Sequence, residues 1–250
     1  MDIKQFFQQH KKVAVAFSGG VDSAVLFMLA VTYAESVKAY YVHSQFQPAF
    51  EREDAITVAR QLGVELEIIE LDILADSVIA ANPADRCYYC KKRIFSAILA
   101  AAQQAGFTTV AEGTNASDAI GDRPGFRALQ ECGVLSPLRL CGLDKAHIRA
   151  IAAANNLPVA HKPSYACLAT RIPAGTRITR QLLQTTELAE DALRARGFRN
   201  FRIRYCEGAA KLELGKQEWE RLSVCRAEVE ALILNYYDDI LFDERERAYE

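Results

Sequence analysis

Short apolar runs of strand length alternate with longer segments of helical spacing through the first two thirds of the chain. The strand-like runs are residues 13–17, 38–43, 64–71 and 108–112, and the helix-like segments are residues 21–35, 51–62, 87–106 and 144–155. Gly106 is expected to act as the C-cap of the third helix. This alternation predicts an open, mainly parallel α/β sheet with helices on both faces. A final short run, residues 157–160, predicts an edge strand.

The pattern breaks at residues 162–180, where two prolines, a glycine, three arginines and a cysteine occur without periodicity. Long irregular segments of this kind are often functional. The pattern then restarts with helices at 181–197 and 216–235 and strands at 201–206, 210–214 and 238–242. We therefore predict two domains, residues 1–165 and residues 166–250, of which the second is a small α+β unit.

Composition narrows the class of protein only a little. The chain has 250 residues, of which 50% are hydrophobic and 25% charged, and its formal net charge is −2. That charge gives no indication of a broad nucleic-acid-binding surface, so we do not expect nucleic acid as a partner. The chain begins without a signal-peptide pattern, and no apolar run has membrane-spanning length, which favours a cytoplasmic protein. Seven cysteines are then more often reduced, metal-binding or catalytic than disulfide-bonded.

A glycine-rich turn lies between the first predicted strand and the first predicted helix. It consists of Ser18, Gly19, Gly20, Val21, Asp22 and Ser23. Backbone N–H groups at a helix N-terminus attract anions, and glycines allow the backbone to come close to them. The hydroxyls of Ser18 and Ser23 can add donors. Asp22 would repel phosphate unless a Mg²⁺ ion bridges the two.

This turn resembles the SGGxDS signature of the PP-loop ATP-pyrophosphatases, which cleave ATP between the α- and β-phosphates. It lacks the Gly-Lys-Ser/Thr of kinases and GTPases and the GxGxxG spacing of dinucleotide-binding proteins. The alternative, an ordinary tight turn, is less favoured because all six residues fall directly after a buried strand.

Further candidate ATP-binding residues follow the other predicted strands, at the sheet edge where ligands bind in open α/β folds. Gly113, Asn115 and Asp118 lie in the segment AEGTNASD after the fourth strand, and Ser44, after the second, is a candidate for contact with adenine. Asp122 and Arg127 follow, and Arg127 could bind a phosphate oxygen. Each of these could equally be a solvated loop residue.

Three cysteines carry candidate sulfur or metal chemistry. Cys87 and Cys90 form a CxxC at the start of a helix, where they share one face beside Lys91 and Lys92, an environment that favours thiolate. Cys167 lies in the irregular segment. Three thiolates are too few for a closed structural zinc site but suit a 4Fe-4S cluster with one open iron. Alternatively, Cys87 and Cys90 are a chance pair on a packed helix, and Cys167 is a small buried residue.

With SGGVDS, AEGTNASD and KPSYACLATRIPAGTRIT in that order, the chain resembles the LarE family from about residue 10 to residue 245. The resemblance implies a fold of the adenine nucleotide α-hydrolase type. It also implies a role in making the nickel-pincer nucleotide cofactor of lactate racemase and related enzymes. Members adenylate a carboxylate of pyridinium-3,5-biscarboxylic acid mononucleotide and convert it to a thiocarboxylate, releasing AMP and pyrophosphate. A homo-oligomer, possibly a hexamer, is also implied.

The resemblance implies two alternative sulfur sources. In one branch of the family the cysteine at the position of Cys167 gives up its own sulfur and becomes dehydroalanine. In the other, a CxxC joins that cysteine to hold an iron–sulfur cluster, and Cys87 and Cys90 place this chain in the three-cysteine branch. We therefore favour the cluster and keep sacrificial use of Cys167 as the alternative.

Arginines around the cysteine segment are candidates for stabilising negative charge and binding substrate. Arg171 and Arg177 lie within that segment, and Arg202 and Arg204 alternate on one face of a predicted strand, where they could bind the substrate phosphate. The family pattern adds Glu190 on the preceding helix. Where that pattern has a histidine and a later arginine, this chain has Cys206 and Lys211.

Three other functions remain open from the sequence. A tRNA thiolation enzyme shares the PP-loop and often three cysteines, but would need an RNA-binding surface. An ammonia-using amide ligase needs no reactive thiol, so it would tolerate Cys167→Ala. A nucleotide-binding regulatory protein would bind ATP without releasing pyrophosphate.

Overall fold

The computed structural model describes residues 1–119, 121 and 124–247, and Asp122 lies outside the described residues. The chain forms two compact units. The first unit contains Met1–Ile73 and Asp85–Lys162, and the second contains Leu74–Ala84 and Pro163–Glu250. The second unit thus begins close to the boundary expected near residue 165, but it also takes in a segment from the first half of the chain.

The first unit is built on a four-stranded parallel sheet. Its strands are β1 (Lys12–Ala16), β2 (Ser36–His43), β3 (Leu66–Glu70) and β4 (Thr109–Ala111), in the order β3-β2-β1-β4. All four were predicted from the apolar runs. Because the sheet is parallel, the carboxyl ends of β1, β2 and β4 meet at one edge, where the loops after these strands come together.

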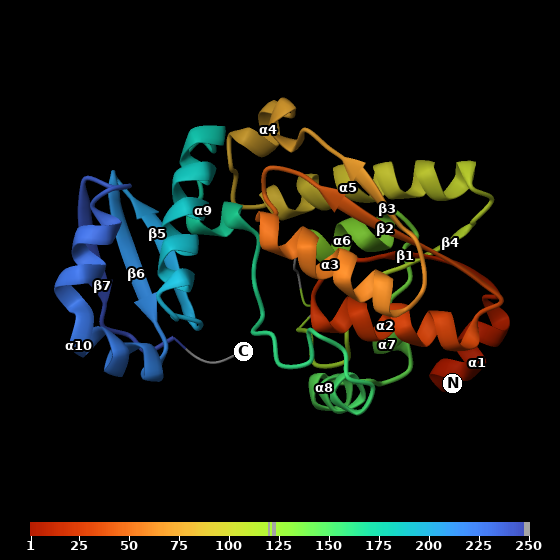
Figure 1. Ribbon diagram of the computed structural model, residues 1–250. Helices are drawn as coiled ribbons and strands as arrows, with labels where there is room; N and C mark the ends of the chain where they lie inside the picture. The colour runs from red at the N-terminus through yellow and green to blue at the C-terminus, as the bar shows by residue number, and fades with distance from the viewer. Residues whose placement is uncertain (120, 122–123, 248–250) are drawn as a thin grey trace. The chain divides into compact units, whose positions relative to one another are not determined.

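Helices cover both faces of this sheet (Figure 1). On one face lie α2 (Val21–Tyr33), α3 (Ala49–Gln61) and α8 (Lys145–Ala154), and on the other α5 (Arg86–Gln104) and α6 (Pro124–Glu131). Successive side chains of a strand point to opposite faces. Accordingly, Val13 and Val15 belong to the first apolar cluster and Ala14 to the second. This two-sided burial explains why the strands are apolar throughout rather than alternating.

Three short helices complete the first unit or connect it to the second. They are α1 (Ile3–Gln9), α7 (Pro137–Leu140) and α4 (Ser77–Ala80), the last within the second unit. The sequence analysis did not predict α1, although Asp2 and Gln5 form a capping box at its start. Gly106 follows α5 with φ of +78°, the left-handed conformation expected after a helix end.

The second unit is a small α+β domain. Strands β5 (Phe201–Cys206), β6 (Ala209–Leu214) and β7 (Asp239–Asp243) form a sheet in that order, with β5 and β6 antiparallel and β6 and β7 parallel. Helices α9 (Arg180–Ala195) and α10 (Lys216–Ile233) contribute to one apolar core with inward residues of β5 and β6, including Ile203 and Leu212. The predicted elements of this unit are all present.

One predicted strand is wrong. Residues 157–160 form successive turns, because Ala160 N donates to the Leu157 carbonyl and Lys162 N to the Val159 carbonyl. Leu157, Val159 and Ala160 are buried in the first core without joining the sheet, and Pro158 is exposed. An apolar run of four residues does not by itself distinguish a strand from a packed turn.

Segment Leu74–Ala84 is held in the second unit by Asn82. Its side-chain amide donates to the carbonyls of Ile172, Pro173 and Thr176 at 3.3, 2.7 and 3.1 Å. Two backbone hydrogen bonds add to this, from Gly175 to Asn82 and from Ile178 to Ala80. In the described part of the chain, no helix is long and apolar enough to cross a membrane.

Candidate functional site

The phosphate loop is ordered by the two serines that begin and end it. Ser23 Oγ donates to the Gly20 carbonyl at 3.0 Å and accepts from Ser18 N at 3.2 Å, and the two serine hydroxyls lie 3.0 Å apart. Gly20 is the N-cap of α2, and among the described residues no side chain caps this helix. The first-turn N–H groups of α2 therefore form an uncapped helix N-terminus, which favours an anion.

Two glycines are required by close backbone contacts. Gly19 has φ of +81°, and a Cβ there would lie 2.8 Å from the Glu51 carbonyl oxygen. A Cβ on Gly113 would lie 2.8 Å from Ser23 N, so the loop after β4 packs directly on the first turn of α2. Gly113 thus allows the loop after β4 to approach the phosphate loop, in addition to lining the cavity described next.

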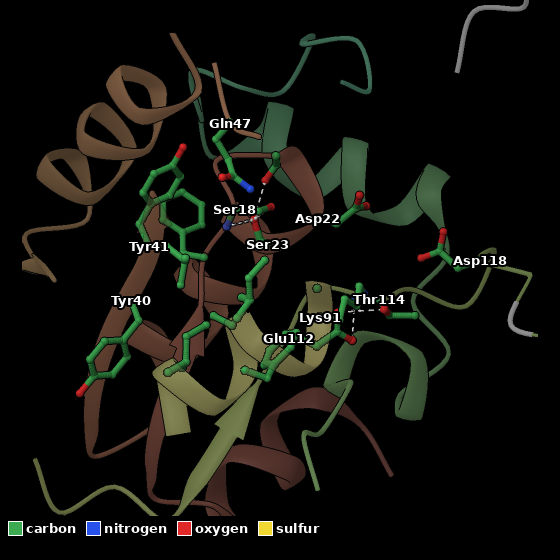
Figure 2. Close-up of a pocket in the computed structure, with 18 residues that line it drawn as sticks. Ser18, Asp22, Ser23, Tyr40, Tyr41, Gln47, Lys91, Glu112, Thr114 and Asp118 are labelled. Atoms are coloured by element: carbon green, nitrogen blue, oxygen red, sulfur yellow. Dashed lines mark hydrogen bonds between the residues drawn. The ribbon is translucent and has the colours of Figure 1, made fainter. Parts of the chain in front are cut away.

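A cavity of about 320 Å³ opens at the carboxyl ends of β1, β2 and β4 (Figure 2). One part of its lining is polar and the other apolar or aromatic. The polar part includes Ser18, Gly20, Asp22, Ser23, Glu112, Gly113, Thr114 and Asp118, and the rest includes Phe17, Tyr40, Tyr41, Val42, Ile94, Phe95 and Ile98. A nucleotide has the same two parts, a charged phosphate chain and a flat, weakly polar base.

Asp22 is held by a cation that the sequence analysis missed. Lys145 Nζ lies 2.6 Å from Asp22 Oδ2, and Asn115 Nδ2 donates to Asp22 Oδ1 at 3.3 Å. Asp118 accepts from Asn115 N at 2.9 Å and also lines the cavity. Lys145 is the first residue of α8, whose N-cap is Asp144, and a lysine at a helix start gives no sequence signal for ligand binding.

The carboxylates of Asp22 and Asp118 fit a Mg²⁺ ion. Magnesium in nucleotide sites takes one or two carboxylates, with phosphate oxygens and water completing the shell. Asp22 is partly exposed, with 26% of its side chain accessible, and Asp118 is likewise accessible to the cavity. Two protein oxygen donors at the mouth of a phosphate loop are therefore a suitable set.

Four candidate ATP ligands, Gly19, Ser44, Asn115 and Arg127, are not among the residues that line this cavity. Ser44 is 4% exposed and donates its hydroxyl to Gln47 Oε1 at 2.7 Å, so Gln47 faces the cavity instead. Arg127 lies on α6 with its guanidinium 4.2 Å from the centre of the Tyr88 ring. Lys91, which the sequence analysis considered only as a neighbour of the cysteines, is among the lining residues.

Cys87 and Cys90 lie in the first turn and a half of α5, where Cys87 is exposed and Cys90 half-buried. This turn is anchored to α6 because both Tyr88 and Lys92 donate to Glu131 Oε2 at 2.7 Å. Within the described ranges, no group of three His, Cys, Asp or Glu side chains is placed to hold a metal ion. The cluster predicted for Cys87, Cys90 and Cys167 therefore stays a prediction.

Cys167 begins a short 3₁₀ helix, η2 (Leu168–Arg171), in the second unit. Its carbonyl accepts from both the backbone N–H and the hydroxyl of Thr170, at 2.9 and 2.8 Å. Arg171 Nη1 donates to the Ala166 carbonyl at 2.8 Å and to Thr170 Oγ1 at 3.0 Å. Arg171 thus fixes the chain on both sides of Cys167.

Arg171 and Glu190 form a two-point ion pair at 2.8 and 3.2 Å, and neither side chain has exposed area. Glu190 also accepts from the Tyr165 hydroxyl at 2.6 Å and from Ile203 N at 3.2 Å. Burial would raise the pKa of Glu190, but these partners, Arg171 above all, hold it below its ordinary value. The structure therefore does not place Arg171 or Glu190 where a ligand could reach them.

The remaining arginine candidates differ in exposure. Arg177 is exposed, and Arg202 is half-buried on the face of β5 away from the apolar core. Arg204, on the same face, pairs with Glu213 and donates to the Thr170 carbonyl at 2.8 Å. Lys211, opposite Arg204 on β6, pairs with Asp243 at 2.8 Å. Arg204 thus lies beside the Cys167 segment.

The parallel sheet, the uncapped glycine-rich loop and the two-part cavity define a PP-loop ATP-binding protein, and the model of the PP-loop domain matches residues 1–120. Among the relatives is the pyridinium-3,5-bisthiocarboxylic acid mononucleotide synthase of Lactiplantibacillus plantarum. It is 32% identical over 206 residues, 82% of this chain and 75% of that protein. The chain belongs to the LarE family and is an ATP-dependent adenylating sulfur transferase.

Two further comparisons give a relative of similar length and a similar fold. An uncharacterised protein of Synechocystis sp. is 33% identical over 219 residues, which cover 87% of this chain and 81% of that protein. Among solved structures, the NMN synthetase of Francisella tularensis matches with a TM-score of 0.51 at 18% identity, over 65% of this chain and 72% of that one. At that identity the match concerns the fold alone.

Proposed function

We propose that this enzyme adenylates a carboxylate of pyridinium-3,5-biscarboxylic acid mononucleotide and replaces one carboxylate oxygen with sulfur, for synthesis of the nickel-pincer nucleotide. The observation that supports this most directly is the extensive similarity to the Lactiplantibacillus plantarum synthase. The phosphate loop and cavity of the first unit would bind ATP, and the Cys167 segment of the second, held by Arg171, would take part in sulfur transfer.

In the first step, a substrate carboxylate oxygen attacks the α-phosphorus of ATP, and pyrophosphate leaves. The N-terminal amides of α2, with Ser18 and Ser23, would bind the pyrophosphate portion. Asp22 and Asp118 would hold Mg²⁺, which neutralises charge on the phosphates. Lys145, which pairs with Asp22 in this structure, would serve as a charged donor to the leaving pyrophosphate. The product of this step is an acyl adenylate.

In the second step, a sulfur nucleophile attacks the activated carbonyl carbon, and AMP leaves. Cys167 is the candidate that carries or becomes this nucleophile. Arg171 and Glu190 act by fixing the backbone beside Cys167, so they are positioning residues. Arg202, Arg204 and the exposed Arg177 are the candidates for binding the substrate phosphate, since guanidinium groups bind phosphate through paired N–H donors.

The sulfur has two possible sources. In the one we favour, Cys87, Cys90 and Cys167 would hold a 4Fe-4S cluster, which would supply sulfide as the nucleophile. Thiolates of a CxxC and one further cysteine are a donor set suited to such a cluster. In the alternative, Cys167 forms a thioester with the substrate, a base removes its Cα proton, and the Cβ–Sγ bond breaks. That route leaves dehydroalanine in the chain and the thiocarboxylate in the product.

The test combines two measurements on anaerobically purified protein. The first is release of pyrophosphate and AMP from Mg²⁺·ATP with and without the pyridinium substrate, with product identification by mass spectrometry. Substrate-dependent release together with a thiocarboxylate product is expected. Release of pyrophosphate with tRNA but not with the pyridinium nucleotide would refute the proposed substrate.

The second measurement is iron and acid-labile sulfide content of the wild type and of Cys87→Ala, Cys90→Ala and Cys167→Ala, with Cys225→Ala as a matched control on α10. Iron lost from the first three variants but not from the control would support the cluster. A wild type without iron after anaerobic reconstitution, and lighter by about 34 Da after turnover, would indicate sacrificial transfer from Cys167 instead.

The two units would divide the work. The first unit would bind ATP, and the second would bind the substrate and provide contacts between subunits of a homo-oligomer. A cytoplasmic location belongs to the same proposal. Light scattering coupled to size-exclusion chromatography tests the oligomer, since a particle of the monomer mass, 27.8 kDa, would contradict it.

A further inference from the structure

A largely buried pair of opposite charges lies beside the phosphate loop without lining the cavity. Lys162 Nζ is 2.8 Å from Glu51 Oε1, and the two side chains are only 13% and 10% exposed. The same ammonium is 2.7 Å from Asp54 Oδ2, one turn further along α3, and 5.1 Å from the centre of the Phe50 ring. Charges so far removed from water are stable only when they are paired.

Glu51 is also in direct contact with the phosphate loop. A Cβ on Gly19 would lie 2.8 Å from the Glu51 carbonyl oxygen and 3.3 Å from its carboxylate Oε2. Phosphates bound at this loop would therefore bring negative charge close to the Glu51 carboxylate. Because these side chains are so little exposed, the repulsion is poorly screened by water and salt. The electrostatic attraction on the Lys162 ammonium is therefore stronger when phosphates occupy the loop than when it is empty.

The main chain of Lys162 is held as firmly as its side chain. Arg149, on α8, donates from Nη1 to the Ala160 carbonyl at 3.0 Å and to the Lys162 carbonyl at 3.4 Å. Lys162 is the last residue of the first unit, and Pro163 begins the second. Cys167 follows Lys162 by five residues in the sequence. The residue that leads into the cysteine segment is thus fixed to the elements that support the phosphate loop.

We propose that the Glu51–Lys162 pair positions the start of the Cys167 segment according to whether the phosphate loop is occupied. Glu51 and Lys162 would then be positioning residues, since neither lines the cavity. Nucleotide at the loop increases the electrostatic attraction on the Lys162 side chain. Lys162 is then held more firmly, and the residues that follow it become more ordered. Both the nucleotide and the cysteine segment bias the same element, which is the physical requirement for coupling. For sulfur transfer this inference rests on the proposed function, since it makes transfer follow adenylation.

Hydrogen–deuterium exchange on the whole protein tests the coupling directly. Adding Mg²⁺·ATP to the wild type is expected to slow exchange by about threefold or more both in residues 18–24 and in residues 164–171. In Lys162→Met, Mg²⁺·ATP should still slow exchange in residues 18–24 but no longer in residues 164–171. In Lys162→Arg, it should slow exchange in both segments. Lys11→Met, which removes an exposed ion pair with Glu35, is the matched control and should behave as the wild type. Protection of residues 164–171 in Lys162→Met would overturn the proposal.

A second readout separates positioning from simple loss of structure. In Lys162→Met, substrate-dependent pyrophosphate release in a single turnover should stay within about twofold of the wild type. Thiocarboxylate formed per pyrophosphate should fall about tenfold, because water hydrolyses the acyl adenylate that sulfur does not reach. Equal loss of both activities, or no change in either, would overturn the proposal. If Lys162→Met does not fold, Glu51→Gln provides the same test.

Failure of the proposed function gives a different result. The wild type would then release no pyrophosphate with the pyridinium nucleotide. The exchange experiment needs only Mg²⁺·ATP, so it would still decide whether the pair couples the loop to residues 164–171.

Discussion

The contact between Gly113 and the first turn of α2 gives a sharp prediction for Gly113→Ala. The added Cβ would lie 2.8 Å from Ser23 N, 2.9 Å from Ser23 Cα and 3.1 Å from the Asp22 carbonyl carbon. These are backbone atoms of the phosphate-binding turn, so no side-chain rotation can relieve the overlap. One methyl group forced into a packed region costs about 1–3 kcal/mol. The lower entropy of the unfolded chain offsets about 0.4–1 kcal/mol of this.

The net expectation for Gly113→Ala is a loss of about 1–2 kcal/mol in the free energy of unfolding. At about 2–4 °C per kcal/mol, the melting temperature of the first unit should fall by about 2–8 °C. Because relief of the overlap displaces the first-turn amides of α2, which we propose bind phosphate, kcat/KM for ATP should fall about tenfold to a hundredfold. Thermal unfolding and a coupled pyrophosphate assay measure the two effects.

A matched substitution in the same unit is Gly125→Ala, near the start of α6. Its Cβ would meet the Lys91 side chain at 3.3 and 3.4 Å, and these methylene groups can move. We expect Gly125→Ala to retain the wild-type melting temperature. If Gly113→Ala also melts at the wild-type temperature and keeps kcat/KM for ATP within about twofold, then the close packing argued for the two loops is refuted.

Three further predictions concern charged and buried groups. Lys145→Met should lower kcat/KM for ATP about tenfold to a hundredfold in the pyrophosphate assay, since it removes a charged donor beside Asp22, and an unchanged value would exclude that role. Glu190→Gln should lower the free energy of urea unfolding by about 3–5 kcal/mol, because it leaves the buried Arg171 charge unpaired, whereas a loss below about 1 kcal/mol would contradict this. Burial raises the pKa of Tyr237 from 10.0 to about 12, so the unfolded state ionises first, and stability that is fully present below pH 10 is lost between pH 10 and 12. Between pH 10 and 12, the free energy of urea unfolding should fall by about 2–3 kcal/mol less in Tyr237→Phe than in the wild type. An equal fall in the two proteins would refute this prediction.

The elements that the sequence predicted well are those whose signal is local. The four strands of the first sheet are apolar on both faces, and the phosphate loop is a contiguous motif between a strand and a helix. The strand predicted at 157–160 was wrong because an apolar run predicts burial but not the backbone conformation. This segment is packed into the core as turns and does not pair with the sheet.

The site residues that the sequence missed depend on contacts between distant segments. Lys145 reaches Asp22 across 123 positions of the chain, and its own neighbourhood shows only a capped helix start. Arg171 is the converse case, a candidate from the sequence whose side chain is buried in the structure. Its chemistry suggested a role at the reacting atoms, but Glu190, 19 residues away, takes it into a buried pair. Residue type and local spacing do not reveal which partner a charge will find after folding.

The capture of Leu74–Ala84 by the second unit has a consequence for how the protein is made. The chain passes between the units after Ile73, after Ala84 and after Lys162, so the C-terminal unit is assembled from two pieces of the sequence. During synthesis the first piece emerges long before residues 172–176, whose carbonyls Asn82 will bind. A nascent chain of which only residues 1–165 have emerged therefore contains all residues of the first core, together with a segment whose partners in the second unit have not yet appeared. A gene fragment starting at Pro163 would encode a second unit that lacks segment Leu74–Ala84.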